Sequence, residues 1–144
     1  MTPTTDYDTD FYQWTQQQAA LLRQGLLSAV DATNLAEEVE SMGKKDRRAM
    51  GSHLRNILLH LLKWRYQPER RGSSWTESIS NARDEVEDIL ADSPSLVPQV
   101  ESLTAAEYPR ARRKATSETG PPLSTFPESC PFTMEQITGD YWPE

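Results

Sequence analysis

Apolar residues recur at spacings of three and four along most of the chain, which is the pattern of helices with one buried face. The first such segment, residues 10–24, places Phe11, Trp14 and Leu21 on one stripe. Gly25 follows it and is expected to end the helix, because glycine readily adopts the left-handed conformation found at helix ends. No segment alternates polar and β-branched residues as a half-buried strand would. The pattern therefore predicts an all-α protein.

Two helices are expected around Gly43, one before it and one after it. Asp31 is predicted to be the N-cap of the first, because its carboxylate can accept hydrogen bonds from the free N–H groups of the next turn. Gly43 is expected to end that helix, and a longer one follows over residues 44–66. The apolar face of the longer helix predicts a central place in the bundle; it comprises Met50, Leu54, Ile57, Leu58, Leu61 and Trp64.

Further helices are predicted after the loop that contains Pro68 and Gly72. Ser74 and Glu77 fit a capping box, in which hydroxyl and carboxylate each accept a backbone N–H, so a helix is expected to begin at Ser74. The next helix is expected over residues 96–107, and Pro109 either kinks it or restarts it toward residue 119.

Prolines and aromatic residues mark the chain from Gly120 onward. Leaving large apolar side chains in water costs roughly 1.5–3 kcal/mol each. We therefore expect residues 120–144 to form an arm that packs on the bundle, with a short helix capped by Thr133. Its apolar residues are Phe126, Phe132, Ile137, Tyr141 and Trp142. The predicted organisation is one domain over residues 1–144: a flexible start (1–8), a bundle of four to five main helices (10–119) and the aromatic, proline-rich C-terminal arm.

Composition supports a globular chain that needs no covalent staple. Of 144 residues, 36% are hydrophobic, and 4 Trp, 5 Tyr and 3 Phe can fill a core. The lone cysteine, Cys130, excludes an internal disulfide and a multi-cysteine zinc site. The acidic first ten residues do not read as a signal peptide, and the longest apolar run, residues 57–62, is too short to cross a bilayer. We expect a cytoplasmic protein with no membrane contact.

The net charge of −7 is unevenly distributed. The segment from Lys44 to Arg71 holds nine basic and two acidic residues, so it carries +7 and the remainder carries −14. Such a segment can face nucleic acid, whose phosphates are bound mainly by Lys and Arg. Alternatively, its cations pair with the acidic clusters at residues 37–40 and 84–88. The acidic chain as a whole favours pairing. A second basic run, residues 110–114, is expected to be a solvated helix face.

One short pattern suggests an enzyme. Arg55 precedes His60 by five residues, which resembles the signature of the HEPN ribonucleases, small α-helical proteins. The resemblance implies that Arg55 stabilises a phosphate and that His60 transfers a proton, without a metal ion. No phosphate-binding glycine loop, nucleophile elbow or zinc-protease motif is present, and Cys130 has no neighbouring base. A catalytic role is therefore kept only as the alternative with Arg55 and His60.

A metal site is a further alternative, in which His60 joins Glu37 or Glu38 from another helix. Two-metal helical bundles use Glu-x-x-His pairs, and this chain has none. A structural His60 that hydrogen-bonds a carboxylate from a facing helix is favoured, so no metal and no other cofactor is expected.

An ordered series of short motifs spans the chain from Tyr7 to Trp142. They include Asp8-Thr-Asp-Phe-Tyr-Gln-Trp14, Leu35-Ala-Glu-Glu-Val-Glu40, Met42-Gly-Lys44, His60-Leu-Leu-Lys-Trp64, Tyr66-Gln-Pro68, Ser74-Trp75, Ser93-Pro-Ser-Leu96, Glu118-Thr-Gly120, Cys130-Pro131 and Trp142-Pro143. Together they resemble the bacterial family catalogued as domain of unknown function 29. The resemblance implies a stand-alone α-helical domain of bacterial origin, and it implies no reaction.

Polar residues in and around these motifs are the candidate binding residues, expected to converge in a groove between the second, third and fourth helices. They are Glu37, Glu38, His60, Lys63, Trp64, Gln67 and Arg83. The alternative is a buried polar network that fixes helix register. We predict a small, non-catalytic protein-interaction module with a protein partner. A homo-oligomer, with the arm exchanged between two copies, is a further alternative.

Overall fold

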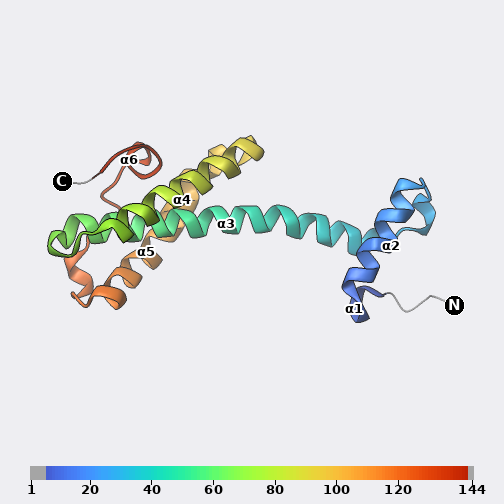
Figure 1. Ribbon diagram of the computed structural model, residues 1–144, viewed down its shortest axis with the longest axis horizontal. Helices are drawn as coiled ribbons and strands as arrows, with labels where there is room; N and C mark the ends of the chain where they lie inside the picture. Colours follow the sequence, from blue (N-terminus) through green and yellow to red (C-terminus); the bar gives the residue numbers. More distant parts are fainter. Residues whose placement is uncertain (1–5, 143–144) are drawn as a thin grey trace. The chain divides into compact units, whose positions relative to one another are not determined.

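The computed structural model describes residues 6–142, which form α-helices and short 3₁₀ helices and contain no strand (Figure 1). The all-α prediction is confirmed. The α-helices are α1 (Asp6–Thr9), α2 (Phe11–Arg23), α3 (Ala32–Tyr66), α4 (Ser73–Asp92), α5 (Val100–Thr119) and α6 (Met134–Thr138). The 3₁₀ helices are η1 (Leu27–Ala29), η2 (Pro68–Arg70), η3 (Pro94–Gln99) and η4 (Leu123–Thr125). Within the described residues, no helix is both long enough and apolar enough to cross a membrane.

The chain divides into two compact units, Met1–Lys45 (the N-terminal unit) and Asp46–Glu144 (the C-terminal unit). Helix α3 contributes residues to both. The single domain expected over residues 1–144 stays a prediction. Of the flexible start expected over residues 1–8, residues 1–5 lie outside the described part, and Asp6–Thr9 forms α1.

In the N-terminal unit, α2 packs on the start of α3 around Asp31. The buried Trp14 donates its indole N–H to Oδ2 of Asp31 (3.1 Å), and the side-chain oxygen of Gln18 accepts the backbone N–H of Asp31 (2.7 Å). Asp31 also accepts hydrogen bonds from the backbone and side chain of Asn34. The Asn34 side-chain bond is the main cause that lowers the pKa of the Asp31 carboxyl. The prediction that Asp31 is an N-cap is confirmed. Asp31 also connects α2 to α3 through its hydrogen bonds with Trp14 and Gln18.

Gly43 does not end a helix, and this prediction is wrong: α3 runs without interruption from Ala32 to Tyr66. A glycine inside a helix costs about 1 kcal/mol relative to alanine but does not stop the helix unless the backbone changes conformation. Gly25 and Gly120 do change, with φ of 73° and 91°, and they follow the last residues of α2 and α5. The predicted stop at Gly25 is confirmed.

Two other helix starts differ from those predicted. Helix α4 begins at Ser73, with Gly72 as N-cap and no side-chain cap, so the capping box at Ser74 is not formed because Ser74 lies within the first turn. Residues 94–99 form η3, so α5 begins at Val100 rather than at residue 96, and it continues through Pro109 to Thr119. Proline removes one N–H bond, and its ring crowds the carbonyl four residues earlier. Buried residues on both sides of Pro109 pack α5 against the core in spite of this.

The C-terminal unit is a bundle in which α4 and α5 lie along the second half of α3 (Figure 1). Three α3 residues, Arg47, Arg55 and Lys63, contact Gln99, Glu107 and Glu118 respectively. The residue numbers of the α3 residues and of their partners increase in the same direction along the contact. Helices α3 and α5 are therefore parallel, and α4, which connects them in the sequence, runs in the opposite direction. The α3 core residues are Met50, Leu54, Ile57, Leu58, Leu59, Leu61 and Leu62. This central position of the α3 segment agrees with the prediction.

The C-terminal arm packs on this bundle, as predicted. Phe126, Phe132 and Ile137 are buried in the same core cluster as α3, α4 and α5. The Tyr108 hydroxyl donates to the carbonyl of Pro127 (2.6 Å), and burial is the main cause that raises its pKa to about 12. The predicted capping box is present at α6, where Thr133 and Gln136 bond each other's backbone N–H groups.

Candidate functional site

The structure places the seven predicted binding residues in different units. Glu37 and Glu38 belong to the N-terminal unit, where Glu38 accepts a 2.6 Å hydrogen bond from the Tyr7 hydroxyl. This bond is the main cause that raises the pKa of Tyr7 to about 12, because the phenolate form could not donate it. The other five residues belong to the C-terminal unit. Convergence of all seven in one groove stays a prediction.

His60 is half-buried on α3 and bonds within its own helix. Its Nδ1–H donates to the backbone carbonyl of Asn56 at 2.8 Å, so the expected carboxylate does not hold this nitrogen. Burial is the main cause that lowers the pKa of His60 below 6.5, and the positive charge of Lys63 lowers it further. The imidazole is therefore neutral at neutral pH.

Lys63 and Gln67 join α3 to the end of α5. The Lys63 side chain is only 8% exposed; its ammonium lies 3.2 Å from the Glu118 carboxylate and 5.6 Å from the centre of the Trp75 ring. The buried Gln67 donates its amide N–H to the Thr119 hydroxyl. These contacts lie within the bundle, as the contacts of a structural polar network would.

Arg83 on α4 holds the C-terminal arm. Its guanidinium donates to the backbone carbonyls of Gln136 (2.7 Å), Ile137 (2.9 Å) and Tyr141 (2.8 Å). Burial is the main cause that lowers the pKa of Arg83. The Trp142 ring packs on this guanidinium and lies 6.0 Å from the ring of Trp64. Two of the predicted binding residues, Arg83 and Trp64, thus contact the chain's own arm.

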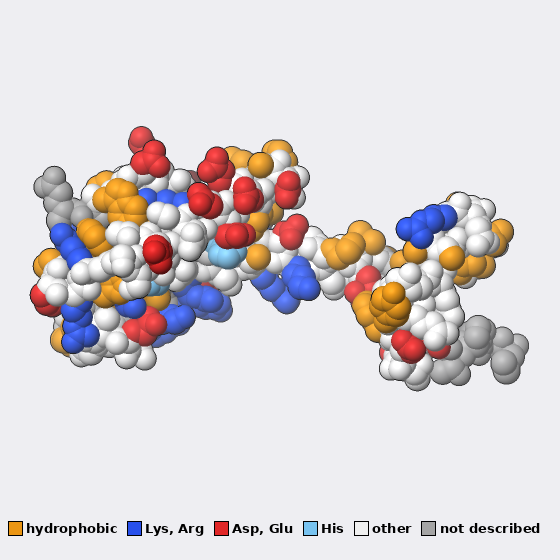
Figure 2. Space-filling view, in the orientation of Figure 1, with side chains coloured by type: hydrophobic (Ala, Val, Ile, Leu, Met, Phe, Trp, Pro, Cys, Tyr) orange, Lys and Arg blue, Asp and Glu red, His pale blue; other side chains and the backbone are white. Residues whose placement is uncertain are grey.

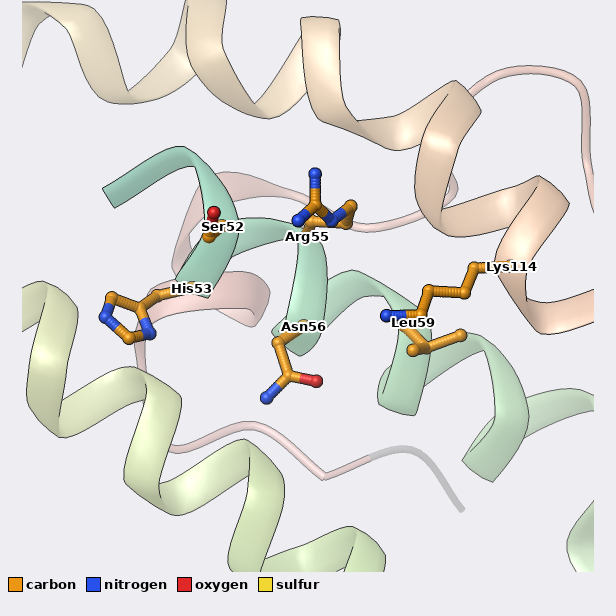
Figure 3. Close-up of a pocket in the computed structure, with 6 residues that line it drawn as sticks. All are labelled: Ser52, His53, Arg55, Asn56, Leu59 and Lys114. Carbon is orange, nitrogen blue, oxygen red and sulfur yellow. The ribbon is translucent and has the colours of Figure 1, made fainter. Parts of the chain in front are cut away.

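A polar cavity of about 200 Å³ opens over α3, and sequence reasoning did not find it (Figure 3). Lys114 extends toward α3 from α5 (Figure 3). The α3 residues 52, 55, 56 and 59 follow the spacing of one helix face, so the face itself was readable from the sequence. The approach of Lys114 depends on the register between α3 and α5, which could not be predicted from the sequence. The lining residues are Ser52, His53, Arg55, Asn56, Leu59 and Lys114.

Arg55 is the fixed cation of this cavity. Its Nη1 lies 3.1 Å from the Glu107 carboxylate, and Arg110 lies 3.5 Å from the other oxygen of Glu107. Gly51 gives the Glu107 side chain room against α3, since a Cβ at Gly51 would lie 3.4 Å from Oε1 of Glu107. The cavity is lined by Arg55 and His53, not by the His60 that the ribonuclease hypothesis requires.

The basic segment of α3 pairs in part with the acidic residues expected and in part with others. Lys44 lies 3.8 Å from Glu40 one helical turn away, whereas Arg55 and Lys63 pair with α5. Within the described residues, the acidic run at positions 84–88 of α4 forms no ion pair. In the C-terminal unit, the carboxylates that pair with the basic residues of α3 therefore belong to α5.

No metal-binding group emerges from the described residues. Between residues 6 and 142, no three or more His, Cys, Asp and Glu side chains lie together as metal ligands would. The alternative with His60 and Glu37 or Glu38 gains no support there. Burial is the main cause that raises the pKa of the half-buried Cys130, so its thiol is less acidic than a free one.

Most of the large apolar side chains that are exposed among the described residues belong to the N-terminal unit, and Figure 2 shows hydrophobic side chains on its surface. Among the described residues, seven of the ten exposed large hydrophobic side chains belong to it, while Trp14 is its one buried hydrophobic residue. Tyr12 is 73% exposed, Leu27 67% and Met42 61%. The others are Phe11, Leu22, Leu26 and Val39. Proteins that act alone rarely leave so much apolar surface in water.

Comparison with known proteins identifies the family and no activity. The family model "Domain of unknown function DUF29" matches residues 7–142, nearly the whole chain. No curated protein and no solved structure matches the chain. The predicted resemblance is confirmed, and the chain belongs to the DUF29 family.

Proposed function

We propose that this chain is a non-catalytic module that binds another protein through the apolar surface of its N-terminal unit. The observation that carries the proposal is that, among the described residues of this unit, seven large hydrophobic side chains are exposed and one, Trp14, is buried. Burying one such side chain against a partner stabilises a complex by roughly 1.5–3 kcal/mol. Four or five of them suffice for a specific interface once the cost of association is met.

Charge indicates the character of the partner. The N-terminal unit holds seven acidic residues against three basic ones, Arg23, Lys44 and Lys45, for a net charge of −4. A complementary surface is apolar at its centre and basic at its rim. An amphipathic helix with lysine and arginine on its flanks has this chemistry.

The test compares two variants of the full chain. Leu26→Ser combined with Leu27→Ser removes two exposed apolar side chains from the N-terminal unit. Val97→Ser, whose side chain is 55% exposed in the C-terminal unit, is the matched control. The tagged wild-type chain captures its partner from extracts of the source cells, and the complex is then rebuilt from two purified proteins.

We expect the double variant to bind the purified partner at least tenfold more weakly, since each lost leucine contact is worth more than 1.4 kcal/mol. Val97→Ser should bind as the wild type does, and salt should weaken the complex because charge contributes. Equal affinity of all three chains, or a loss confined to Val97→Ser, would disprove the proposed surface.

The ribonuclease alternative keeps one supporting observation: Arg55 lines an open polar cavity. It requires His60 to act on the same phosphate, whereas His60 donates Nδ1–H to Asn56 and does not line that cavity. RNA cleavage in the presence of a chelator, abolished both by Arg55→Lys and by His60→Ala in folded protein, would establish this alternative. Absence of cleavage by the wild-type chain would end it.

A further inference from the structure

The cavity over α3 contains hydrogen-bond donors that the protein leaves unused. The Ser52 hydroxyl, the His53 ring, the Asn56 amide and the Lys114 ammonium form no hydrogen bond or ion pair with any other described residue. The buried Leu59 side chain lines the same cavity. Four unpartnered polar groups around one hollow of about 200 Å³ form a site whose donors are available to a ligand.

Arg55 adds a fifth donor group in a defined orientation. Its Nη1 is held by Glu107 at 3.1 Å, whereas Nε and Nη2 form no hydrogen bond with the described residues. The N–H groups of Nε and Nη2 point to the same side of the guanidinium, so together they offer the paired donor that binds two oxygens of one phosphate. The Glu107 ion pair fixes the plane of this fork.

The charges around the cavity favour an anion. Two cations, Arg55 and Lys114, line the cavity, and no acidic residue lines it. The Glu107 carboxylate lies outside the lining and is shared between Arg55 and Arg110. Lys114 forms no ion pair with a carboxylate of the described residues.

We infer that this cavity binds the phosphate group of a small phosphate ester. The Arg55 fork contacts two phosphate oxygens, Lys114 supplies a mobile charge, and Ser52 and Asn56 donate to the remaining oxygens. The cavity is open to solvent, so the organic part of the ester extends outward from the phosphate. The inference is independent of the proposed protein interaction, because the cavity lies wholly within the C-terminal unit.

The test is a titration of ¹⁵N-labelled full-length chain with inorganic phosphate and with glycerol 3-phosphate, followed by NMR at constant ionic strength. We expect saturable shifts at the backbone amides of residues 52–59 and 114, with the ester binding at least as tightly as inorganic phosphate. Lys114→Gln should weaken binding about tenfold, because a hydrogen bond to a charged group is lost. Arg55→Lys, which keeps the charge but loses the fork, should weaken it by a similar factor.

The matched control is Arg113→Gln, an exposed neighbour on α5 that removes the same charge outside the cavity. It should bind both probes as the wild type does. Equal loss in Arg113→Gln and Lys114→Gln would reduce the effect to net charge and overturn the inference. Shifts that never saturate, or saturation with inorganic phosphate and none with the ester, would overturn it as well.

Discussion

The guanidinium of Arg83 lies over the indole ring of Trp142, 5.2 Å from its centre. The same guanidinium donates hydrogen bonds to three backbone carbonyls of the C-terminal arm. A side chain that was predicted to bind an external ligand thus binds the chain's own arm through Nε and Nη2. Arg83 connects α4 to the arm in the way a ligand-binding arginine connects to its ligand, by charge-assisted hydrogen bonds and a ring contact.

Replacing Arg83 by lysine should weaken the attachment of the arm. The ammonium keeps the charge but cannot reach three carbonyls at once, so we expect the free energy of unfolding in urea to fall by about 2 kcal/mol. Limited proteolysis after residue 120 should become faster. Arg113→Lys, on the exposed side of α5, should leave both measurements unchanged. An arm that resists protease equally in both variants would contradict this role.

His60 should make stability depend on pH. Its folded-state pKa is lowered by burial, so the unfolded chain binds a proton more readily near pH 6.5. The stabilising contribution of the neutral ring is complete above the unfolded pKa of 6.5 and decreases as the pH falls toward the folded-state value. Urea unfolding measured between about pH 7.5 and pH 5 should show a smaller loss for His60→Gln than for the wild type. Identical losses would show that the ring is not desolvated.

The Lys63–Glu118 pair should respond asymmetrically to substitution. Glu118→Gln leaves a buried ammonium without its carboxylate and should lower the free energy of unfolding by about 1–3 kcal/mol. Lys63→Met replaces the ammonium with an apolar group of similar length and should change stability by less than about 1 kcal/mol, because Glu118 is free to return to water. Chemical denaturation of both variants measures the difference. A larger loss for Lys63→Met would assign the ammonium a stabilising role of its own.

Two glycines should respond oppositely to alanine. Gly43 lies inside α3 with no atom near the position of a Cβ, so Gly43→Ala should stabilise the chain by up to about 1 kcal/mol. Gly25 has a φ of 73°, where a Cβ is strained, so Gly25→Ala should destabilise it by about 1–2 kcal/mol. Thermal unfolding followed by circular dichroism tests both. The same sign of change in both variants would contradict the conformations described for α2 and α3.

The sequence predicted the helices and the arm, because both depend on burial. Phe126, Phe132 and Ile137 were recognised as apolar residues too costly to leave in water, and all three are buried. Helix interruptions were predicted less well. A glycine such as Gly43 often follows the last residue of a helix, and the sequence therefore predicted a helix end there. A glycine ends a helix only where its φ becomes positive, and Gly43 keeps the helical conformation. The value of φ at a glycine is set by packing with distant segments, which the neighbouring sequence does not show.

The candidate sites were predicted least well, because they depend on contacts between distant segments. Lys63, Gln67 and Arg83 were singled out as polar residues in helical motifs, but their partners are Glu118, Thr119 and the arm. No spacing rule connects residues about fifty positions apart. For the same reason, the contribution of Lys114 to the α3 cavity became visible only once α3 and α5 were in register.

The packed arm also determines when the C-terminal unit can finish folding. A ribosome releases α3, α4 and α5 before it releases Phe126, Phe132 and Ile137, which complete their core. During that interval the nascent helices expose the apolar surfaces that these three side chains will cover, and such surfaces are what chaperones bind. A chain that ends before residue 126 therefore lacks α6 and the three arm side chains that complete the core.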